Sequence, residues 1–211
     1  QLLDFFQTIN QCVTVYKHCS ADLFESETMG RFLPPSAMDT TMLVLGHENI
    51  SLSFHIITGL PGQSGESLSQ TLRQIKLYGA KEIVPHPLEI VAGTPFAAQV
   101  TELAASSSPR RHLPNEKERA GLWGLAQAWC EREGYKESVS GRFSLPGYAS
   151  LYHQKESEGM ALLGFGAGAR TVMDGVEAEN TWDLNAYIRY SPDPERIIAR
   201  ATPASETAAL K

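Results

Sequence analysis

The residues best suited to ligand binding in this sequence are glycines that follow a predicted strand. Gly59-Leu60-Pro61-Gly62-Gln63 comes directly after the apolar end of the segment 50–57. In a parallel α/β sheet the carboxyl end of a strand borders the ligand crevice, and glycines there let the backbone approach a ligand closely. The sequence therefore indicates a binding loop here, with an ordinary Gly-Pro turn as the equally weighted alternative.

A second glycine-rich segment is Gly164-Phe165-Gly166-Ala167-Gly168-Ala169-Arg170. It contains G-x-G but lacks the third glycine of the dinucleotide fingerprint, and it occurs late in the chain, so a Rossmann interpretation is disfavoured. A tight turn with exposed backbone amides fits better. Arg170 would then supply positive charge to a carboxylate of a ligand. The alternative is a surface arginine on a turn of small residues.

Two further residues have chemically useful side chains near predicted strand ends. Glu89 lies at the end of the segment 82–90, and carboxylates at strand ends of α/β barrels are often functional. A capping or turn role for Glu89 is nearly as well supported. His55 lies within the segment 50–57, where a buried histidine with a hydrogen-bond partner is the preferred interpretation.

The three cysteines, Cys12, Cys19 and Cys130, do not form a recognisable metal or disulfide pattern. Cys12 and Cys19 are seven residues apart, which fits no common ligand spacing. An odd and sparse count favours free thiols in a reducing compartment. The sequence also contains no nucleophile elbow with a Ser-His-Asp arrangement, no H-E-x-x-H and no P-loop.

The elements that must position these residues alternate between strand and helix in the first hundred residues. Strands are predicted over 12–16, 50–57 and 82–90, and helices over 21–29, 36–45, 68–79 and 115–134. This alternation predicts βαβ units and a parallel sheet. The later part is more antiparallel, with short strands over 135–140, 161–165 and 171–176. Asp174-Gly175 signals a hairpin turn, and Asp183 is expected to cap a last helix.

Composition and charge exclude several classes of function. The chain has 211 residues, 42% of them hydrophobic and 20% charged, and a formal net charge of −6. Its densest basic cluster, Arg110-Arg111-His112, is too short to track a phosphate backbone, so nucleic-acid binding is not expected. The sequence has no run of 18 apolar residues and no signal-peptide pattern, so neither a transmembrane segment nor secretion is expected. Both ends read as cut rather than natural.

Taken together, the motifs resemble the oxygen-independent coproporphyrinogen III oxidase-like family of radical S-adenosylmethionine (SAM) proteins. The Gly59 segment is similar to the family's Y-G-L-P-G-Q, and the Gly164 segment to its L-G-x-G-x-G-A. The matches occur in the family's order: Met29-Gly30-Arg31, Ile56 to Ser64, Leu88 to Phe96, Gly134-Tyr135, Phe143, Pro146-Gly147, Leu163 to Ala169, Asn180, Asp183 and Tyr187.

This resemblance implies an α/β fold, a partial (β/α) TIM-like barrel of radical SAM type with a C-terminal α+β extension. Residues 1–105 would be the later part of the barrel, and 106–211 a truncated extension. The resemblance implies SAM as cofactor and a [4Fe-4S] cluster whose C-x-x-x-C-x-x-C ligands are not in this chain. It also implies a tetrapyrrole substrate, porphyrinogen or heme, and a cytoplasmic location. On its own, this chain is expected to be inactive.

The site residues that the resemblance carries over are Arg31, His55 and Pro87 on the SAM side and Arg170 toward the tetrapyrrole. Two positions depart from the family pattern, because Cys19 replaces a glutamine that contacts SAM and His55 replaces an aspartate. Arg170 likewise replaces a histidine. The resemblance therefore leaves a second hypothesis open: a heme-binding chaperone or a homologue without catalysis, with His55, His86 or Cys19 as axial heme ligands. An unrelated α/β barrel enzyme is a third, disfavoured interpretation.

Overall fold

The computed structural model of this chain describes residues 14–18, 21–28, 39–40, 42, 51–109, 111–191, 193 and 198–203. The chain divides into two compact units, Gln1–Ser150 and Leu151–Lys211. The division predicted at residue 105 falls inside the first unit, because the helix and hairpin that follow it pack on the first unit's sheet. Cys12, Cys19 and Arg31 lie outside the described residues.

The first unit is built on a mixed five-stranded sheet in the order β1-β2-β3-β5-β4. Strands β1 (Thr14–His18), β2 (Ser51–Thr58) and β3 (Glu82–Pro87) are parallel, as the alternation of strands and helices predicted. The hairpin of β4 (Lys136–Val139) and β5 (Arg142–Ser144) joins antiparallel to the start of β3. No closed barrel is formed by the described strands.

Proline is accommodated in β3 because the strand has neighbours on both sides only at its start. Pro85 is paired with Ile56 of β2 on one side, whereas β5 pairs only with Glu82 and Ile83 on the other. At Pro85, β3 is therefore an edge strand among the described residues, so its missing N–H interrupts no ladder there. The strand ends at Pro87, three residues before the predicted end.

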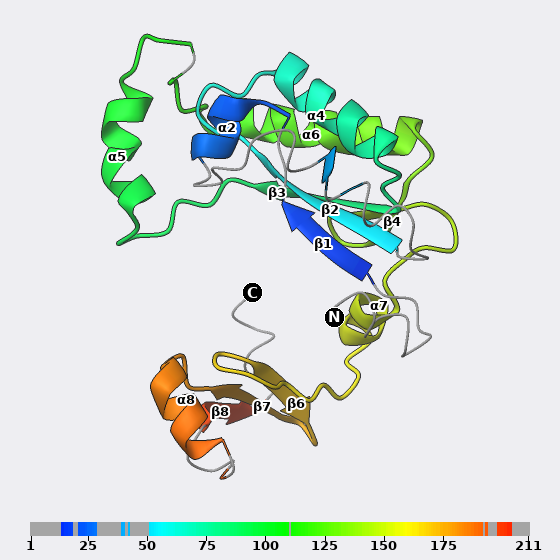
Figure 1. The fold of residues 1–211 in the computed structure, drawn as a ribbon, viewed down its shortest axis with the longest axis vertical. Coiled ribbons are helices and arrows are strands. Elements are labelled where there is room, and N and C mark those ends of the chain that lie inside the picture. The colour runs from blue at the N-terminus through cyan, green and yellow to red at the C-terminus, as the bar shows by residue number, and fades with distance from the viewer. Residues whose placement is uncertain are drawn as a thin grey trace. The chain divides into compact units, whose positions relative to one another are not determined.

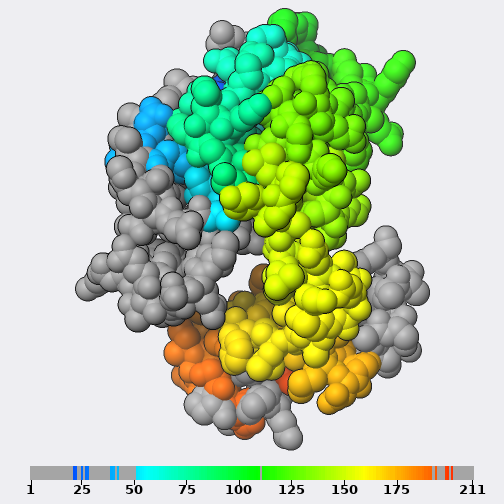
Figure 2. All heavy atoms as spheres, turned by 90° about the vertical axis from the view of Figure 1, so that its right-hand side faces the viewer, coloured from blue at the N-terminus to red at the C-terminus, as the bar shows by residue number. Residues whose placement is uncertain are grey.

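One face of this sheet is covered by helices (Figure 1). Helix α4 (Gly65–Leu77) contributes Leu68, Leu72 and Ile75, and α6 (Glu116–Arg132) contributes Ala126 and Cys130 to a core that includes alternate residues of β2. The space-filling view shows α4 and α6 lying side by side (Figure 2). Both helices start with a capping box, and Asn115 and Glu118 form the one predicted for α6.

Helix α6 runs antiparallel to the parallel strands. Its first turns lie beside Gly59, which directly follows β2. Just beyond its last turn, the Tyr135 hydroxyl donates to the Ala80 carbonyl, which precedes β3. The short α2 (Leu23–Thr28) and the more peripheral α5 (Pro95–Ala104) complete the helices of this unit whose bounds are described. Residues 39, 40 and 42 are helical, inside the predicted 36–45.

The second unit has the mixed helix and strand content expected of the extension. Helix α7 (Leu151–Ser157) precedes an antiparallel sheet of β6 (Arg170–Met173), β7 (Val176–Asn180) and β8 (Ile198–Pro203), with α8 (Leu184–Tyr190) between the last two strands. The predicted hairpin turn is confirmed, since Met173 pairs with Val176 across Asp174 and Gly175, both with positive φ. The predicted strand 161–165 is reduced to a bridge between Leu162 and Val172. Asp183 caps α8 as predicted.

Candidate functional site

The two faces of the first unit's sheet differ in chemistry. Leu52, Phe54 and Ile56 of β2 point toward the helices and are buried in the apolar core. Alternation along a strand sends the intervening residues to the opposite face. That face, called the polar face below, carries these side chains: Ser53, His55, Glu82, His86, Ser138, Arg142 and Ser144. Ile57 and Val84 lie on the same face, and of the polar side chains only His55, His86 and Ser138 are partly exposed.

At the amino-terminal end of the polar face, Glu82 forms a buried ion pair with Arg142. The Arg142 Nη2 and Nε donate to the two Glu82 carboxylate oxygens at 2.6 and 3.1 Å, a bidentate geometry. The Ser53 hydroxyl also donates to Glu82, at 2.6 Å, and the Ser144 hydroxyl lies 3.4 Å from it. Since Glu82 and Arg142 are paired in this way, this end of the face is a structural link between β3 and β5.

Nearer the carboxyl end, two histidines interact across neighbouring strands. His55 Nδ1 lies 2.7 Å from His86 Nε2, and the rings stack with their centroids 4.9 Å apart. A hydrogen bond between two ring nitrogens requires one donor and one acceptor, so at least one of the two facing nitrogens carries no proton. Both side chains are half-buried. His55 thus has the hydrogen-bond partner predicted for it.

The Gly59-Leu60-Pro61-Gly62-Gln63 loop is held in place by its own glutamine. The Gln63 side chain accepts from the Gly59 N–H at 2.6 Å and donates to the Ile57 carbonyl at 3.0 Å. It also donates to the buried Glu25 carboxylate, which accepts in turn from the Ser67 hydroxyl at 2.6 Å. The loop is therefore attached to α2 and to the start of α4, and Gln63, predicted as part of a binding loop, has a structural role that the sequence did not indicate.

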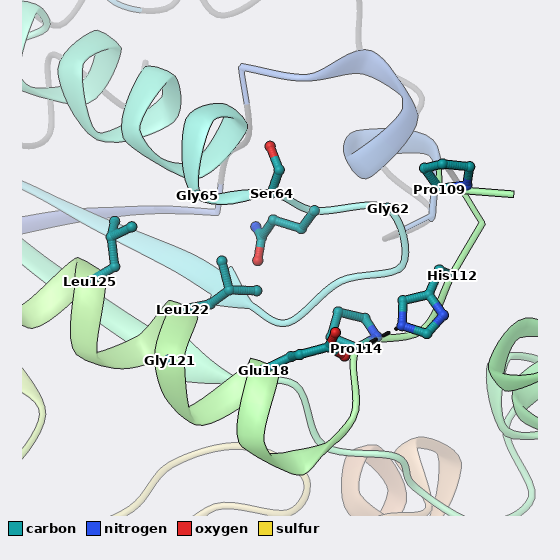
Figure 3. A pocket seen from close by; sticks show the side chains of 11 residues that line it. Gly62, Ser64, Gly65, Pro109, His112, Pro114, Glu118, Gly121, Leu122 and Leu125 are labelled. Carbon is teal, nitrogen blue, oxygen red and sulfur yellow. Dashed lines mark hydrogen bonds and ion pairs between the residues drawn. The ribbon is translucent and has the colours of Figure 1, made fainter. Parts of the chain in front are cut away.

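A cavity of about 330 Å³ lies beside this loop, between the start of α4 and the first half of α6 (Figure 3). Figure 3 shows Leu122 and Leu125 on its apolar wall, and His112 with Glu118 at its polar end. His112 Nε2 lies 3.3 Å from a Glu118 oxygen. The Asn115 backbone N–H, and secondarily His112, lower the pKa of Glu118. Glu118 is thus an anion engaged in capping α6.

Of the site residues predicted in the first unit, His55 and Pro87 lie near each other and Arg31 is outside the described residues. His55 and Pro87 lie on adjacent strands, β2 and β3, toward their carboxyl ends. Pro87 is exposed, as is Glu89 beyond it. The neighbouring Gly93-Thr94-Pro95 has a structural role, because the Thr94 hydroxyl accepts from the Ala97 N–H and caps α5. Arg31 falls outside the described residues, so its role stays a prediction.

Arg170 belongs to the second unit, where it contacts carboxylates of the chain itself. Its Nε donates to Glu177 at 2.7 Å and its Nη1 to Glu156 at 3.2 Å. The Glu177 hydrogen bond, together with the charges of both glutamates, raises the pKa of Arg170. Its binding to a ligand carboxylate stays a prediction, and such a ligand would have to replace one of these two partners.

The glycine-rich segment next to Arg170 forms a turn tied to α8 and β7. The Gly166 N–H donates to the Tyr187 hydroxyl at 2.9 Å, and the Asn180 amide donates to the Gly166 carbonyl at 2.9 Å. Gly168 lies against the Trp182 ring, where an added Cβ would be 2.6 Å from the nearest ring atom. The tight turn predicted for this segment is confirmed, but its backbone amides are not exposed as expected, because those of Gly164, Gly166 and Gly168 donate to groups of the chain itself.

The described residues offer no site for a metal cluster. They contain no group of three or more His, Cys, Asp and Glu side chains placed to hold a metal ion. Cys130 is buried in the core, and burial raises the pKa of its thiol to about 12, so it is not a thiolate at neutral pH. Within the same residues, no helix is long and apolar enough to cross a membrane.

Comparisons with known proteins agree with this architecture. No protein-family pattern matches the chain. The heme chaperone HemW of Lactococcus lactis subsp. lactis (strain IL1403) is 24% identical over 155 residues, which are 72% of this chain and 38% of that protein. The structure of coproporphyrinogen III oxidase (HemN) from Escherichia coli, a radical SAM enzyme, superimposes with a TM-score of 0.72 at 17% identity, over 96% of this chain and 48% of that one.

The fold of this chain is thus similar to that of HemN. Its similarity in sequence to HemW and in fold to HemN supports the family resemblance of its ordered motifs, that of the oxygen-independent coproporphyrinogen III oxidase-like proteins. It spans less than half the length of either protein it matches.

Proposed function

We propose that this chain is part of a radical SAM protein of heme or porphyrin metabolism, and that SAM binds at the carboxyl ends of β1, β2 and β3. The observation that carries the proposal is the polar sheet face. Its histidines, His55 and His86, lie near the carboxyl ends of β2 and β3, where the Gly59 loop begins. Open α/β sheets bind their ligands at this edge. The match in fold to a radical SAM coproporphyrinogen oxidase supports the choice of cofactor.

The residues of this edge are compatible with SAM. Gly59 has φ +90°, which turns the chain at the end of β2. His55 stands at the position of the family's carboxylate and is hydrogen-bonded to His86, and Pro87 borders the same edge. Arg31 is the further contact that the family resemblance implies. When bound and cleaved, SAM supplies a radical, and these residues orient it.

The [4Fe-4S] cluster does not fit the described residues. Cys130 is buried with a raised pKa, and no alternative ligand set is present among them. The proposal therefore assigns the cluster ligands to sequence outside this chain, and this chain by itself would not cleave SAM. The tetrapyrrole partner, like the cytoplasmic location, is proposed from the family resemblance together with the sparse cysteines.

The proposal is tested by measuring SAM binding to the natural protein by isothermal titration calorimetry. We expect His55→Ala and His86→Ala to weaken binding about 10-fold, the loss of one well-made polar contact. His153→Ala, in the second unit, is the matched control and should leave binding unchanged. Anaerobic reconstitution of the same protein with iron and sulfide should give a bound cluster, and subsequent addition of SAM and the one-electron reductant dithionite should give methionine and 5′-deoxyadenosine. A protein that binds no SAM and gains no cluster would contradict the proposal.

The His55–His86 pair favours a second candidate function, heme binding without catalysis. One imidazole would ligate the heme iron while the other hydrogen-bonds its second ring nitrogen, an arrangement that orients metal-bound histidines in general. A titration with hemin should then shift the Soret band; replacing the ligating histidine by alanine should abolish the shift, and replacing its partner should weaken heme binding about 10- to 100-fold. A Soret shift that both variants retain would eliminate this pair as the heme ligand.

A further inference from the structure

Arg119 occupies an unusual position for a charged residue, on the side of α6 that faces the sheet. Ala126 and Cys130, seven and eleven residues further along, are both fully buried on this side. Residues at these spacings share one face of an α-helix. Arg119 is half-buried and lies in the first turn of α6, where the helix passes the carboxyl end of β2.

The aliphatic part of Arg119 packs directly against Gly59. A Cβ added to Gly59 would lie 2.7 Å from Arg119 Cγ and 2.9 Å from its Cδ. The glycine of the Gly59-Leu60-Pro61 loop therefore leaves room for the Arg119 side chain as well as adopting a positive φ. This contact fixes the arginine stem at the edge of the sheet where the loop begins.

The guanidinium of Arg119 has no carboxylate or hydrogen-bond partner among the described residues. The other half-buried or buried arginines in that part of the chain are paired, Arg142 with Glu82 and Arg170 with Glu177 and Glu156. Even exposed arginines such as Arg73 contact a glutamate. The burial of Arg119 is that of its aliphatic stem on Gly59, and its guanidinium is paired with no carboxylate among the described residues, so it is available to bind an anion at this edge of the sheet.

We propose that Arg119 binds a carboxylate group of the ligand at the carboxyl edge of the sheet. The guanidinium fork matches a carboxylate with two parallel hydrogen bonds. This inference rests on the proposed function, under which two ligands carry such a group: SAM at its amino-acid end and a tetrapyrrole on its propionates. Arg119 is a binding residue on α6, sixty positions after the loop that it contacts.

The test compares each ligand with a partner compound that lacks the carboxylate. Dissociation constants of SAM, 5′-methylthioadenosine, coproporphyrin III and coproporphyrin III tetramethyl ester are measured for the natural protein and for Arg119→Gln. We expect Arg119→Gln to weaken binding of one carboxylate-bearing ligand about 10- to 100-fold, as for loss of a charge-assisted contact. Binding of its carboxylate-free counterpart should not change. Whichever pair responds identifies the source of the carboxylate.

Two further variants make the result decisive. Arg111→Gln removes an arginine that pairs with Glu102 on the surface, and it should not alter any of the four constants. Arg119→Lys keeps the stem on Gly59 and the charge but not the fork, so it should weaken binding less than Arg119→Gln. If Arg119→Gln does not fold, Arg119→Lys serves as the test in its place.

Equal constants for the wild type and both Arg119 variants would overturn the inference alone, provided that the wild type binds SAM or the porphyrin. A wild type that binds neither would overturn the proposed function and the inference with it.

Discussion

At the scale of single residues, position 59 requires glycine for two reasons: its backbone conformation and its contact with Arg119. Its φ of +90° disfavours any side chain, and an added methyl group would displace the Arg119 stem. We expect Gly59→Ala to lower the free energy of unfolding by about 1–3 kcal/mol. Urea denaturation measures this change.

Gly121 provides the matched control, because it is exposed within α6 and an added Cβ would meet no atom within 4 Å. Gly121→Ala should raise the free energy of unfolding by up to about 1 kcal/mol through helix propensity. Equal effects of the two substitutions would show that position 59 tolerates a side chain.

The buried hydroxyl of Tyr135 should make the stability of the fold depend on pH. Its hydroxyl donates to the Ala80 carbonyl at 2.9 Å, and burial, followed by the Cys130 and Glu133 charges, raises its pKa to about 12. A raised pKa means that the folded state favours the neutral phenol. The stability that the phenol contributes is therefore complete below about pH 10, the pKa of a free tyrosine, and is lost as the pH rises toward 12.

Tyr135→Phe should accordingly lower the free energy of unfolding at pH 7 by about 1 kcal/mol, through the lost hydrogen bond. The difference from the wild type should shrink at pH 10 and above, where unfolding releases the tyrosine proton only in the wild type. Urea titrations of both proteins at pH 7, 10 and 11 give the comparison. A difference that is independent of pH would contradict the raised pKa.

Predictions for single residues succeeded where the interacting residues are close in the sequence. The Asn115–Glu118 capping box and the Asp174-Gly175 turn involve neighbours in the chain, so the sequence was sufficient to predict them. His55 was predicted to have a partner, but the sequence did not identify His86, because the pairing depends on strand register. Arg119 was missed for the same reason, since its contact with Gly59 depends on where α6 lies.

At the scale of elements, the Glu82–Arg142 ion pair joins the parallel strands to the antiparallel hairpin. Both side chains are nearly fully buried, at 3% and 10% exposed. Removing one partner leaves an uncompensated charge, so Glu82→Gln or Arg142→Met should each lower the free energy of unfolding by about 3–5 kcal/mol. The double variant should be less destabilised than the sum of the two, with a coupling energy of about 1–3 kcal/mol.

A double-mutant cycle in urea measures this coupling, and the exposed Arg73–Glu66 pair serves as the control. That surface pair should give a coupling energy below about 1 kcal/mol. Additive effects at Glu82 and Arg142 would show that the pair does not stabilise the β3–β5 junction.

The elements themselves were largely predictable because each has a strong local pattern. The apolar spacing of Leu68, Leu72 and Ile75 marked α4, and the alternating segment 50–57 marked β2 to within one residue at each end. The position of β5 beside β3 was not predictable. It depends on the Glu82–Arg142 pair, whose members are sixty residues apart.

At the scale of the whole molecule, the two units differ in how much apolar surface they bury. The first unit holds the cluster of buried apolar residues around Phe54 and Leu72. In the second unit, Asn180 is the one buried residue among those described. Its apolar side chains are largely exposed, as for Phe165 at 80%, Trp182 at 75% and Ile188 at 66%. Burial of apolar area is the main source of folding stability, so the second unit should be the less stable of the two.

We therefore expect backbone amides of β6, β7 and β8 to exchange hydrogen at least about 100-fold faster than those of β2 and β3, because regions with few buried apolar contacts open at lower free energy. Hydrogen–deuterium exchange of the natural protein, followed by mass spectrometry, gives both rates in one experiment. The short β4–β5 hairpin is an internal control, since it is small but attached to the first unit's sheet by Glu82 and Arg142, and its central amides should be protected like β3. Equal protection of the two units at low protein concentration would contradict the expected order, and would mean that the exposed apolar side chains of the second unit are covered in solution.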